Sequence, residues 1–227
     1  MKKNKGKRKS WELAAQGCAA NEVVDRYGNA AKQHLVAYSG RDNEDGTNLT
    51  RSLKKISESK INSDYRKQNI RQQSGFSAEV EYVARQNAEN IIKGDNTRYS
   101  RTDDLGRVND PVLDIVRLDS DGIEIPGTGE QMKFVGSNPV SCLAKLKSKK
   151  FEKYLDHDVV ITVPSDYFEG IKKAIDNEIN SIRKQEESLA KNGSSQTVAS
   201  IKAKEAKLLK IKKNFCVVIL GLTNVKS

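Results

Sequence analysis

The pattern of apolar and polar positions is sharpest from Ser74 onward. Ser74 is a suitable N-cap for a helix, and Gly94 with Asp95 is a suitable end. Between them apolar side chains recur at helical spacing, at Phe76, Val80, Val83 and Ile91. Glu79 lies three residues after Phe76, so it is expected at the edge of the buried face rather than opposite it.

Strand patterns follow this helix. Residues 97–102 are predicted as a short edge strand, and residues 109–136 as three strands separated by two tight turns. Asp114 falls in the first of these three strands, and Gln131 and Lys133 fall in the last. Because strand side chains alternate between faces, Gln131 and Lys133 are expected to point the same way. The Asp114 carboxylate among β-branched neighbours needs a partner, such as a lysine or a metal ion on the adjoining strand.

The remaining pattern is mostly helical. Residues 11–39 are Ala-rich and helix-prone, and a second helix is predicted over about residues 138–155. Residues 158–163 form a dense apolar run that is typical of a strand buried on both faces. From Ser165, two amphipathic helices joined by a polar turn at 192–195 predict an antiparallel hairpin.

These elements predict an α/β (α+β) protein with four regions: a basic disordered arm (1–10), a helical N-terminal region (11–73), an α/β core (74–166), and a helical hairpin with an apolar tail (167–227). The chain has 227 residues, of which 36% are apolar and 31% charged, and this suits one modest core with appended helices. Its net charge of +10 favours a polyanionic partner, either nucleic acid or an anionic membrane surface. The basic arm is either a solubilising tail or a nonspecific phosphate contact.

Cysteine and histidine chemistry is not indicated. The three cysteines and two histidines are isolated, so they match neither a disulfide framework nor a zinc motif, and a reducing cytoplasm is expected. No apolar segment follows the charged N-terminus as it would in a signal peptide. The most apolar run, residues 215–222, is shorter than the roughly 20 residues that span a bilayer. It is interpreted as a closing strand or a packed tail, and no integral membrane segment is expected.

The order helix, weak strand, strand, strand, helix, strand between Ser74 and Asp166 resembles the αβββαβ core of the PD-(D/E)xK (restriction-endonuclease-like) nucleases. The segments GFSAE, LDIV, EQMKFVG and ITVPSD are also similar to a group of bacterial proteins with SGFAFE, an Asp strand, IQTKY and IEVPSD, which are assigned to that superfamily. Its motif is an acid on the first helix, an Asp on the second strand, and a Glu or Gln followed at the second position by Lys on the third. The matching positions in this chain are Glu79, Asp114, Gln131 and Lys133.

The resemblance implies a phosphodiester hydrolase that depends on Mg²⁺ or Mn²⁺. Asp114 would be the main metal ligand, Gln131 would add its carbonyl oxygen, and Glu79 would bind directly or through water. Lys133 would orient the attacking water or stabilise developing negative charge. Mg²⁺ prefers oxygen ligands and keeps several waters, so one or two carboxylates suffice. Gln131 in place of the usual acid removes one negative charge and should weaken metal binding.

Simpler interpretations of the same residues stay open. Asp114 and Lys133 could form an ordinary cross-strand salt bridge, and residues 119–122 a hairpin turn rather than the start of a calcium loop. Asp103 or Asp104 could either enter the site or stay a solvated loop acid. The Lys-rich faces of the late helices are either solvated surface or a groove for phosphates.

Three functions are therefore weighed. The first is a DNA endonuclease, with RNA as a possible substrate, from a defence system, a toxin or a mobile element. The second is a catalytically inactive nucleic-acid-binding module that retains the nuclease fold. The third is a protein-interaction module in which the hairpin over residues 167–213 docks a partner helix or a second copy.

Overall fold

The computed structural model describes residues 4–157, 159–190 and 195–218. The α-helices, in chain order, are α1 (Asn4–Ser39), α2 (Leu53–Ser57), α3 (Arg66–Lys93), α4 (Pro139–Leu146), α5 (Glu152–Asp156), α6 (Ser165–Ala190) and α7 (Ser195–Lys213). The strands are β1 (Arg98–Arg101), β2 (Ile115–Leu118), β3 (Glu130–Met132), β4 (Val160–Pro164) and β5 (Phe215–Val218). Short 3-10 turns are η1 (Ser63–Tyr65), η2 (Thr102–Leu105) and η3 (Lys149–Phe151). The chain is thus of the mixed α+β class.

The five strands form one mixed sheet in the order β1-β2-β3-β4-β5. Neighbours β1, β2 and β3 are antiparallel, whereas β4 and β5 join in parallel to the strand before them. The crossover from β3 to β4 contains α4 and α5, and that from β4 to β5 contains the α6–α7 hairpin. Both crossovers include helices, as parallel neighbours require.

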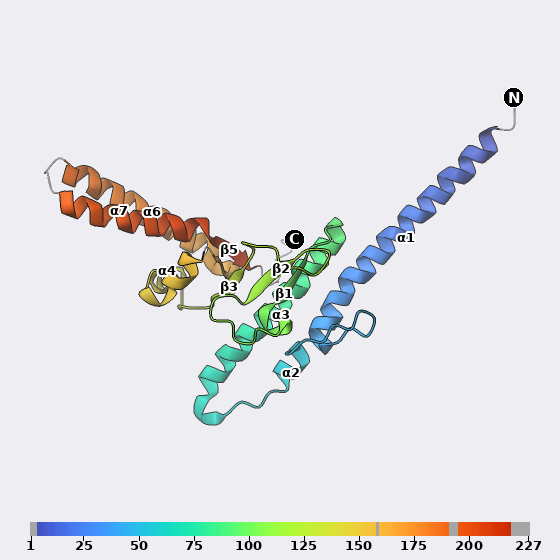
Figure 1. Cartoon of the computed structure of the whole chain (residues 1–227), viewed down its shortest axis with the longest axis horizontal. Coiled ribbons are helices and arrows are strands. Elements are labelled where there is room, and N and C mark those ends of the chain that lie inside the picture. The colour runs from blue at the N-terminus through green and yellow to red at the C-terminus, as the bar shows by residue number, and fades with distance from the viewer. Residues whose placement is uncertain (1–3, 158, 191–194, 219–227) are drawn as a thin grey trace, which may run out of the picture.

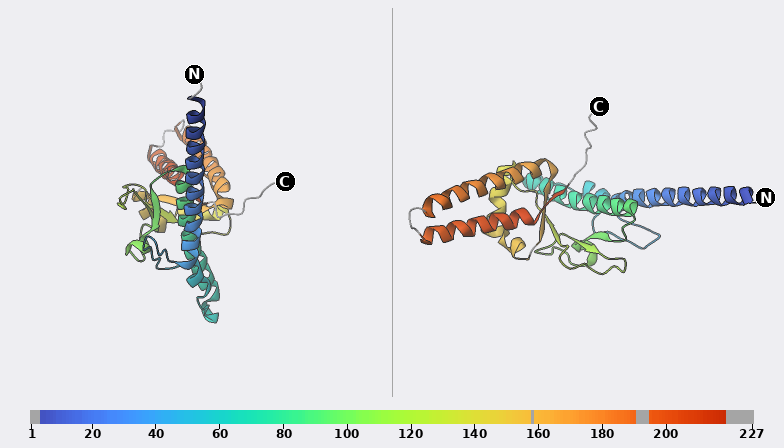
Figure 2. Two further views of the ribbon diagram at one scale, coloured as in Figure 1. Left: turned by 90° about the vertical axis from the view of Figure 1, so that its right-hand side faces the viewer. Right: turned by 90° about the horizontal axis from the view of Figure 1, so that it is seen from above.

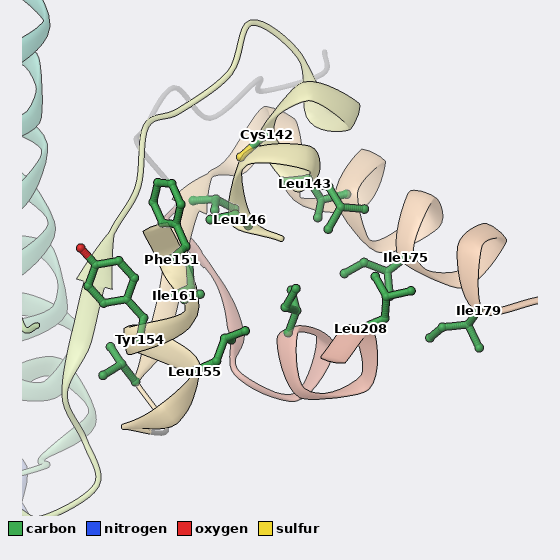
Figure 3. Packing of buried hydrophobic residues seen from close by; sticks show 14 residues of the cluster. Cys142, Leu143, Leu146, Phe151, Tyr154, Leu155, Ile161, Ile175, Ile179 and Leu208 are labelled. Atoms are coloured by element: carbon green, nitrogen blue, oxygen red, sulfur yellow. The ribbon is translucent and has the colours of Figure 1, made fainter. Parts of the chain in front are cut away.

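The two faces of the sheet are covered differently. On one face α3 lays Ala78 and Tyr82 against Ile115 and Met132 of the strands. The larger core lies on the other face, where β4 meets α4, α6 and α7. Figure 3 shows Tyr154 at one end of this core and Ile179 at the other. The hairpin packs its own apolar positions inward, at Ile171, Ile175, Ile179, Leu208 and Ile211.

The N-terminal region attaches to α3 on its outer side. The C-terminal half of α1 and the short α2 pack Ala37 and Ile56 against Val80 and Ala84 of α3. The first turns of α1 extend far from the sheet, on the side away from the hairpin (Figures 1 and 2). Of the expected disordered arm (1–10), residues 4–10 belong to α1 instead, and residues 1–3 lie outside the described residues. Lysine and arginine are good helix formers, and the Ala-rich segment that follows can propagate the helix into them.

The boundaries of α3 differ from the prediction. The helix begins at Arg66, and Ser74 lies inside it, where its hydroxyl donates to the Ile70 carbonyl at 2.8 Å. The hydroxyl of a serine can bond back to the carbonyl four residues earlier, so Ser74 need not cap a helix. The predicted end is confirmed, because Gly94 closes α3 in the left-handed conformation at φ +73°.

Two predicted elements are shorter than expected. The middle strand of residues 109–136 is reduced to a single bridge between Leu118 and Glu124, with a turn closed by the Asp119 side chain. The helix expected over 138–155 is interrupted by η3, which separates two shorter helices, α4 and α5. Of the two residues that could cap its start, Ser137 and Asn138, the N-cap is Asn138, in a reciprocal capping box.

Other elements agree with the prediction. The edge strand β1, the buried strand β4 and the helix that starts at Ser165 lie where the pattern placed them. Residues 215–218 of the apolar run close the sheet as β5, and residues 219–222 lie outside the described residues. Among the described helices none is long and apolar enough to cross a membrane.

Candidate functional site

Asp114 and Gln131 meet at the junction of β2 and β3. Asp114 directly precedes β2, and its backbone N–H donates to the Glu130 carbonyl at 2.9 Å, which fixes its register against β3. Its Oδ2 accepts from the Met132 backbone N–H at 2.9 Å and from the Gln131 side-chain amide. Its Oδ1 has no hydrogen-bond partner among the described residues. One carboxylate oxygen is therefore held in place and the other is available.

Lys133 follows β3 and shares this side of the sheet with Asp114. Its backbone N–H donates to the Thr162 carbonyl at 2.8 Å, and its Nζ lies 4.8 Å from the centre of the Tyr154 ring. Burial lowers the pKa of Lys133, and the Asp114 carboxylate opposes this shift. Burial raises the pKa of Asp114, opposed in turn by the Lys133 charge. The Asp114 carboxylate and the Lys133 ammonium therefore attract each other, but they form no direct ion pair within the described part of the chain.

Glu79 on α3 joins this electrostatic group. Its pKa is raised to about 8, first by burial and then by the carboxylates of Asp114 and Asp103, whereas the Arg101 and Arg51 charges oppose the shift. Its carboxylate makes no hydrogen bond within residues 4–157, 159–190 and 195–218. A half-buried carboxylate without a hydrogen bond, near a second carboxylate, is a group that a bound cation would stabilise.

An ionic network connects the site to the segment before α3. The Arg101 side chain is 1% exposed, and its Nε and Nη2 donate to both oxygens of Asp104 at 2.8 Å. The same Nη2 donates to the Arg51 carbonyl at 3.0 Å, while Nη1 is buried and has no hydrogen-bond partner in the described part of the chain. Arg51 pairs with Asp103 at 3.1 Å, and Asp104 accepts from the Thr50 backbone N–H at 2.8 Å. Residues 50–51 are thereby fixed beside η2.

The neighbouring acid Glu130 does not belong to the site. It lies on the α3 face, where Thr162 donates to it at 3.0 Å and the Tyr82 hydroxyl also binds it. Burial raises the pKa of Glu130. Because side chains alternate along β3, Glu130 and Gln131 point to opposite faces of the sheet.

The four residues singled out in the sequence thus fall into two groups. The Asp114–Gln131 hydrogen bond joins one pair directly, whereas Lys133 and Glu79 reach Asp114 through electrostatics over longer distances. Sequence reasoning did not single out Tyr154, whose ring lies beside the Lys133 ammonium. No local signal identifies it, because its position beside Lys133 depends on how α5 packs against the strands.

The donor set suits a hard cation that keeps part of its water shell. Within the described residues no three His, Cys, Asp or Glu side chains come close enough to hold a metal by themselves. Oδ1 of Asp114 and the Glu79 carboxylate have no hydrogen-bond partner among the described residues, and a 180° turn of the Gln131 amide would present its oxygen instead of its N–H₂. Mg²⁺ and Mn²⁺ accept such a set because water completes the coordination.

The chain was compared with protein-family models, with curated proteins and with solved structures. No family model, curated protein or solved structure matches it.

Proposed function

We propose that the chain is a metal-dependent nucleic-acid phosphodiester hydrolase of the PD-(D/E)xK type, with DNA as its favoured substrate. The observation that carries the proposal is the hydrogen bond between Asp114 and Gln131 at the junction of β2 and β3, with the charges of Lys133 and of the half-buried Glu79 interacting with Asp114. The order α3-β1-β2-β3-α4-β4, with three antiparallel strands and then a parallel one, supports it as well.

The roles of the residues follow from their surroundings. Asp114, Glu79 and Gln131 would hold Mg²⁺ or Mn²⁺, which supplies an activated water and neutralises charge on the phosphate. Asp114 is oriented for this by the Met132 N–H, which binds the oxygen that faces the strand. Lys133 stands in a partly desolvated place, so its ammonium interacts strongly with an anionic phosphate and can give up a proton more readily than an exposed lysine.

Cleavage of supercoiled plasmid and of a single-stranded RNA in the presence of Mg²⁺ or Mn²⁺ tests the proposal. Wild type is expected to cut, and Asp114→Asn and Lys133→Met are each expected to lose at least about 100-fold in rate. Asp156→Asn is the matched control, since that side chain is 71% exposed and lies at the end of α5. Activity that survives both site variants would remove this site from consideration.

A second function is favoured by one specific observation. The Gln131 side-chain amide donates to Oδ2 of Asp114, and an amide–carboxylate pair of this kind is what a site without metal would keep. An inactive nucleic-acid-binding module would bind DNA with strong salt dependence and would not cut it with either metal. Binding without cleavage by the wild-type protein would therefore select this function over the hydrolase.

A further inference from the structure

A pocket of about 300 Å³ lies between α2 and the first half of α3, next to the candidate site. Arg51, Lys55 and Lys60 contribute three cations to its lining, which contains no carboxylate. Neither lysine forms an ion pair within the described residues. A concave surface with unpaired positive charge and no acid is suited to an anionic ligand.

The rest of the lining is suited to a nucleobase rather than to phosphate alone. Three carboxamide side chains, those of Asn69, Gln72 and Gln73, project from α3 into the pocket. Gln72 makes no hydrogen bond among the described residues, so its donors and its acceptor are available to base edges. Phe76 forms part of the wall, and the Arg51 guanidinium lies 3.8 Å from its ring centre, an arrangement on which a base can extend the stack.

The position of the pocket links it to the site. Phe76 comes one turn before Glu79 on α3, and Arg51 pairs with Asp103, whose charge acts on Glu79. Gln72 and Glu79 are separated by about 10 Å along the helix axis, at 1.5 Å per residue. This length corresponds to roughly three steps of a nucleic-acid strand with a rise of 3.4 Å.

We propose that this pocket binds a nucleotide of the substrate strand, two or three positions from the phosphodiester group at Asp114. Lys55 and Lys60 contact the phosphate, and Gln72 with the Arg51–Phe76 stack contacts the base. The inference rests on the proposed function, because that function sets how the bound nucleic-acid strand runs from the pocket to Asp114. It also assigns a task to the residues before α3, which the nuclease resemblance does not cover.

The test measures binding of a fluorescent 12-nucleotide single strand by anisotropy, without divalent metal so that no cleavage occurs. The pocket variant is Lys55→Ala with Lys60→Ala. The matched control is Lys54→Ala with Lys67→Ala, which removes the same charge from α2 and from the first turn of α3, outside the pocket. All four lysines are exposed, so both variants should fold, and circular dichroism checks this.

The pocket variant is expected to weaken binding about tenfold, and the control less than twofold. Two lost phosphate contacts should also reduce the slope of log K against log salt by about 1.4. Gln72→Ala is expected to weaken binding without changing this slope. Equal losses in pocket and control variants, or no measurable binding by wild type, would overturn the inference.

Failure of the pocket and failure of the proposed function give different results. If wild type cuts plasmid and the pocket variant binds as tightly as wild type, the nucleotide-binding role of the pocket is refuted. The hydrolase proposal then remains. If wild type never cuts, but its binding depends on Lys55 and Lys60 and not on the control lysines, the hydrolase proposal is refuted. The nucleotide-binding role of the pocket then remains.

Discussion

Replacing Glu79 by glutamine is expected to stabilise the metal-free protein at high pH. The substitution keeps the shape of the side chain and removes a charge that burial and the nearby Asp114 carboxylate both disfavour. Most single substitutions destabilise proteins, so a gain in stability from a substitution that keeps the shape of the side chain is an informative outcome.

The magnitude follows from the pKa of Glu79, which is about 8 in the folded chain and 4.5 when unperturbed. At 1.36 kcal/mol per pH unit, this difference corresponds to roughly 5 kcal/mol once the group is ionised. Glu79 keeps part of its surface in water, which screens the penalty, so a gain of about 2–3 kcal/mol is expected for Glu79→Gln at pH 9. Because the folded state holds the proton more tightly, the stability contributed by Glu79 is complete below pH 4.5 and is lost as the pH rises through about 8.

Urea unfolding at pH 5, 7 and 9 in the presence of a chelator measures this effect. The difference between Glu79→Gln and wild type should grow from below about 1 kcal/mol at pH 5 to its full value at pH 9. Glu81→Gln is the matched control, two residues away on α3, where the glutamate side chain is 43% exposed and pairs with Arg85 at 3.6 Å. An equal gain at pH 5 and pH 9, or a loss at pH 9, would refute the raised pKa of Glu79 and the burial that mainly causes it.

Two further substitutions test the surroundings of the site. Gln131→Glu replaces the hydrogen bond to Asp114 by like-charge repulsion, so unfolding without metal should become easier by about 2 kcal/mol; if the proposed metal position is correct, Mg²⁺ should restore the melting temperature of this variant more than that of wild type. Arg101→Met leaves the Asp104 carboxylate without its buried partner and is expected to cost about 3–5 kcal/mol in urea unfolding, whereas a loss below about 1 kcal/mol would mean that Arg101 does not hold residues 50–51 in place.

The parts of the fold that sequence pattern could predict are those with strong local signals. Asn138 followed by Pro139 fixes the start of α4, and Pro164 with Ser165 fixes the junction of β4 and α6. The start of α3 could not be predicted, because residues 66–73 carry few apolar side chains and their helix is a continuation from the packed segment after Ser74. The prediction of a middle strand within residues 109–136 was wrong, because among the described residues this segment pairs only through the bridge between Leu118 and Glu124.

The candidate site, too, could be predicted from the sequence only where the local pattern was strong. Alternation along β3 was enough to predict that Gln131 and Lys133 share a side, and the helical spacing from Phe76 placed Glu79 at the margin of the buried face. Asp103 was considered only as one of two loop acids, and nothing in the sequence distinguishes it from Asp104. The difference arises in three dimensions, where Asp104 binds the buried Arg101 and Asp103 is left to pair with the half-exposed Arg51.

This difference explains how the N-terminal region and the site depend on each other. The charges of Arg51 and Arg101 both oppose the raised pKa of Glu79, and Asp104 and Arg101 bind the backbone of residues 50–51. Removing the segment before α3 would take Arg51 from the site and leave Asp103 unpaired beside Glu79 and Asp114. The carboxylates would then repel one another more strongly, so the core from residue 74 to residue 166 is not expected to be electrostatically complete by itself.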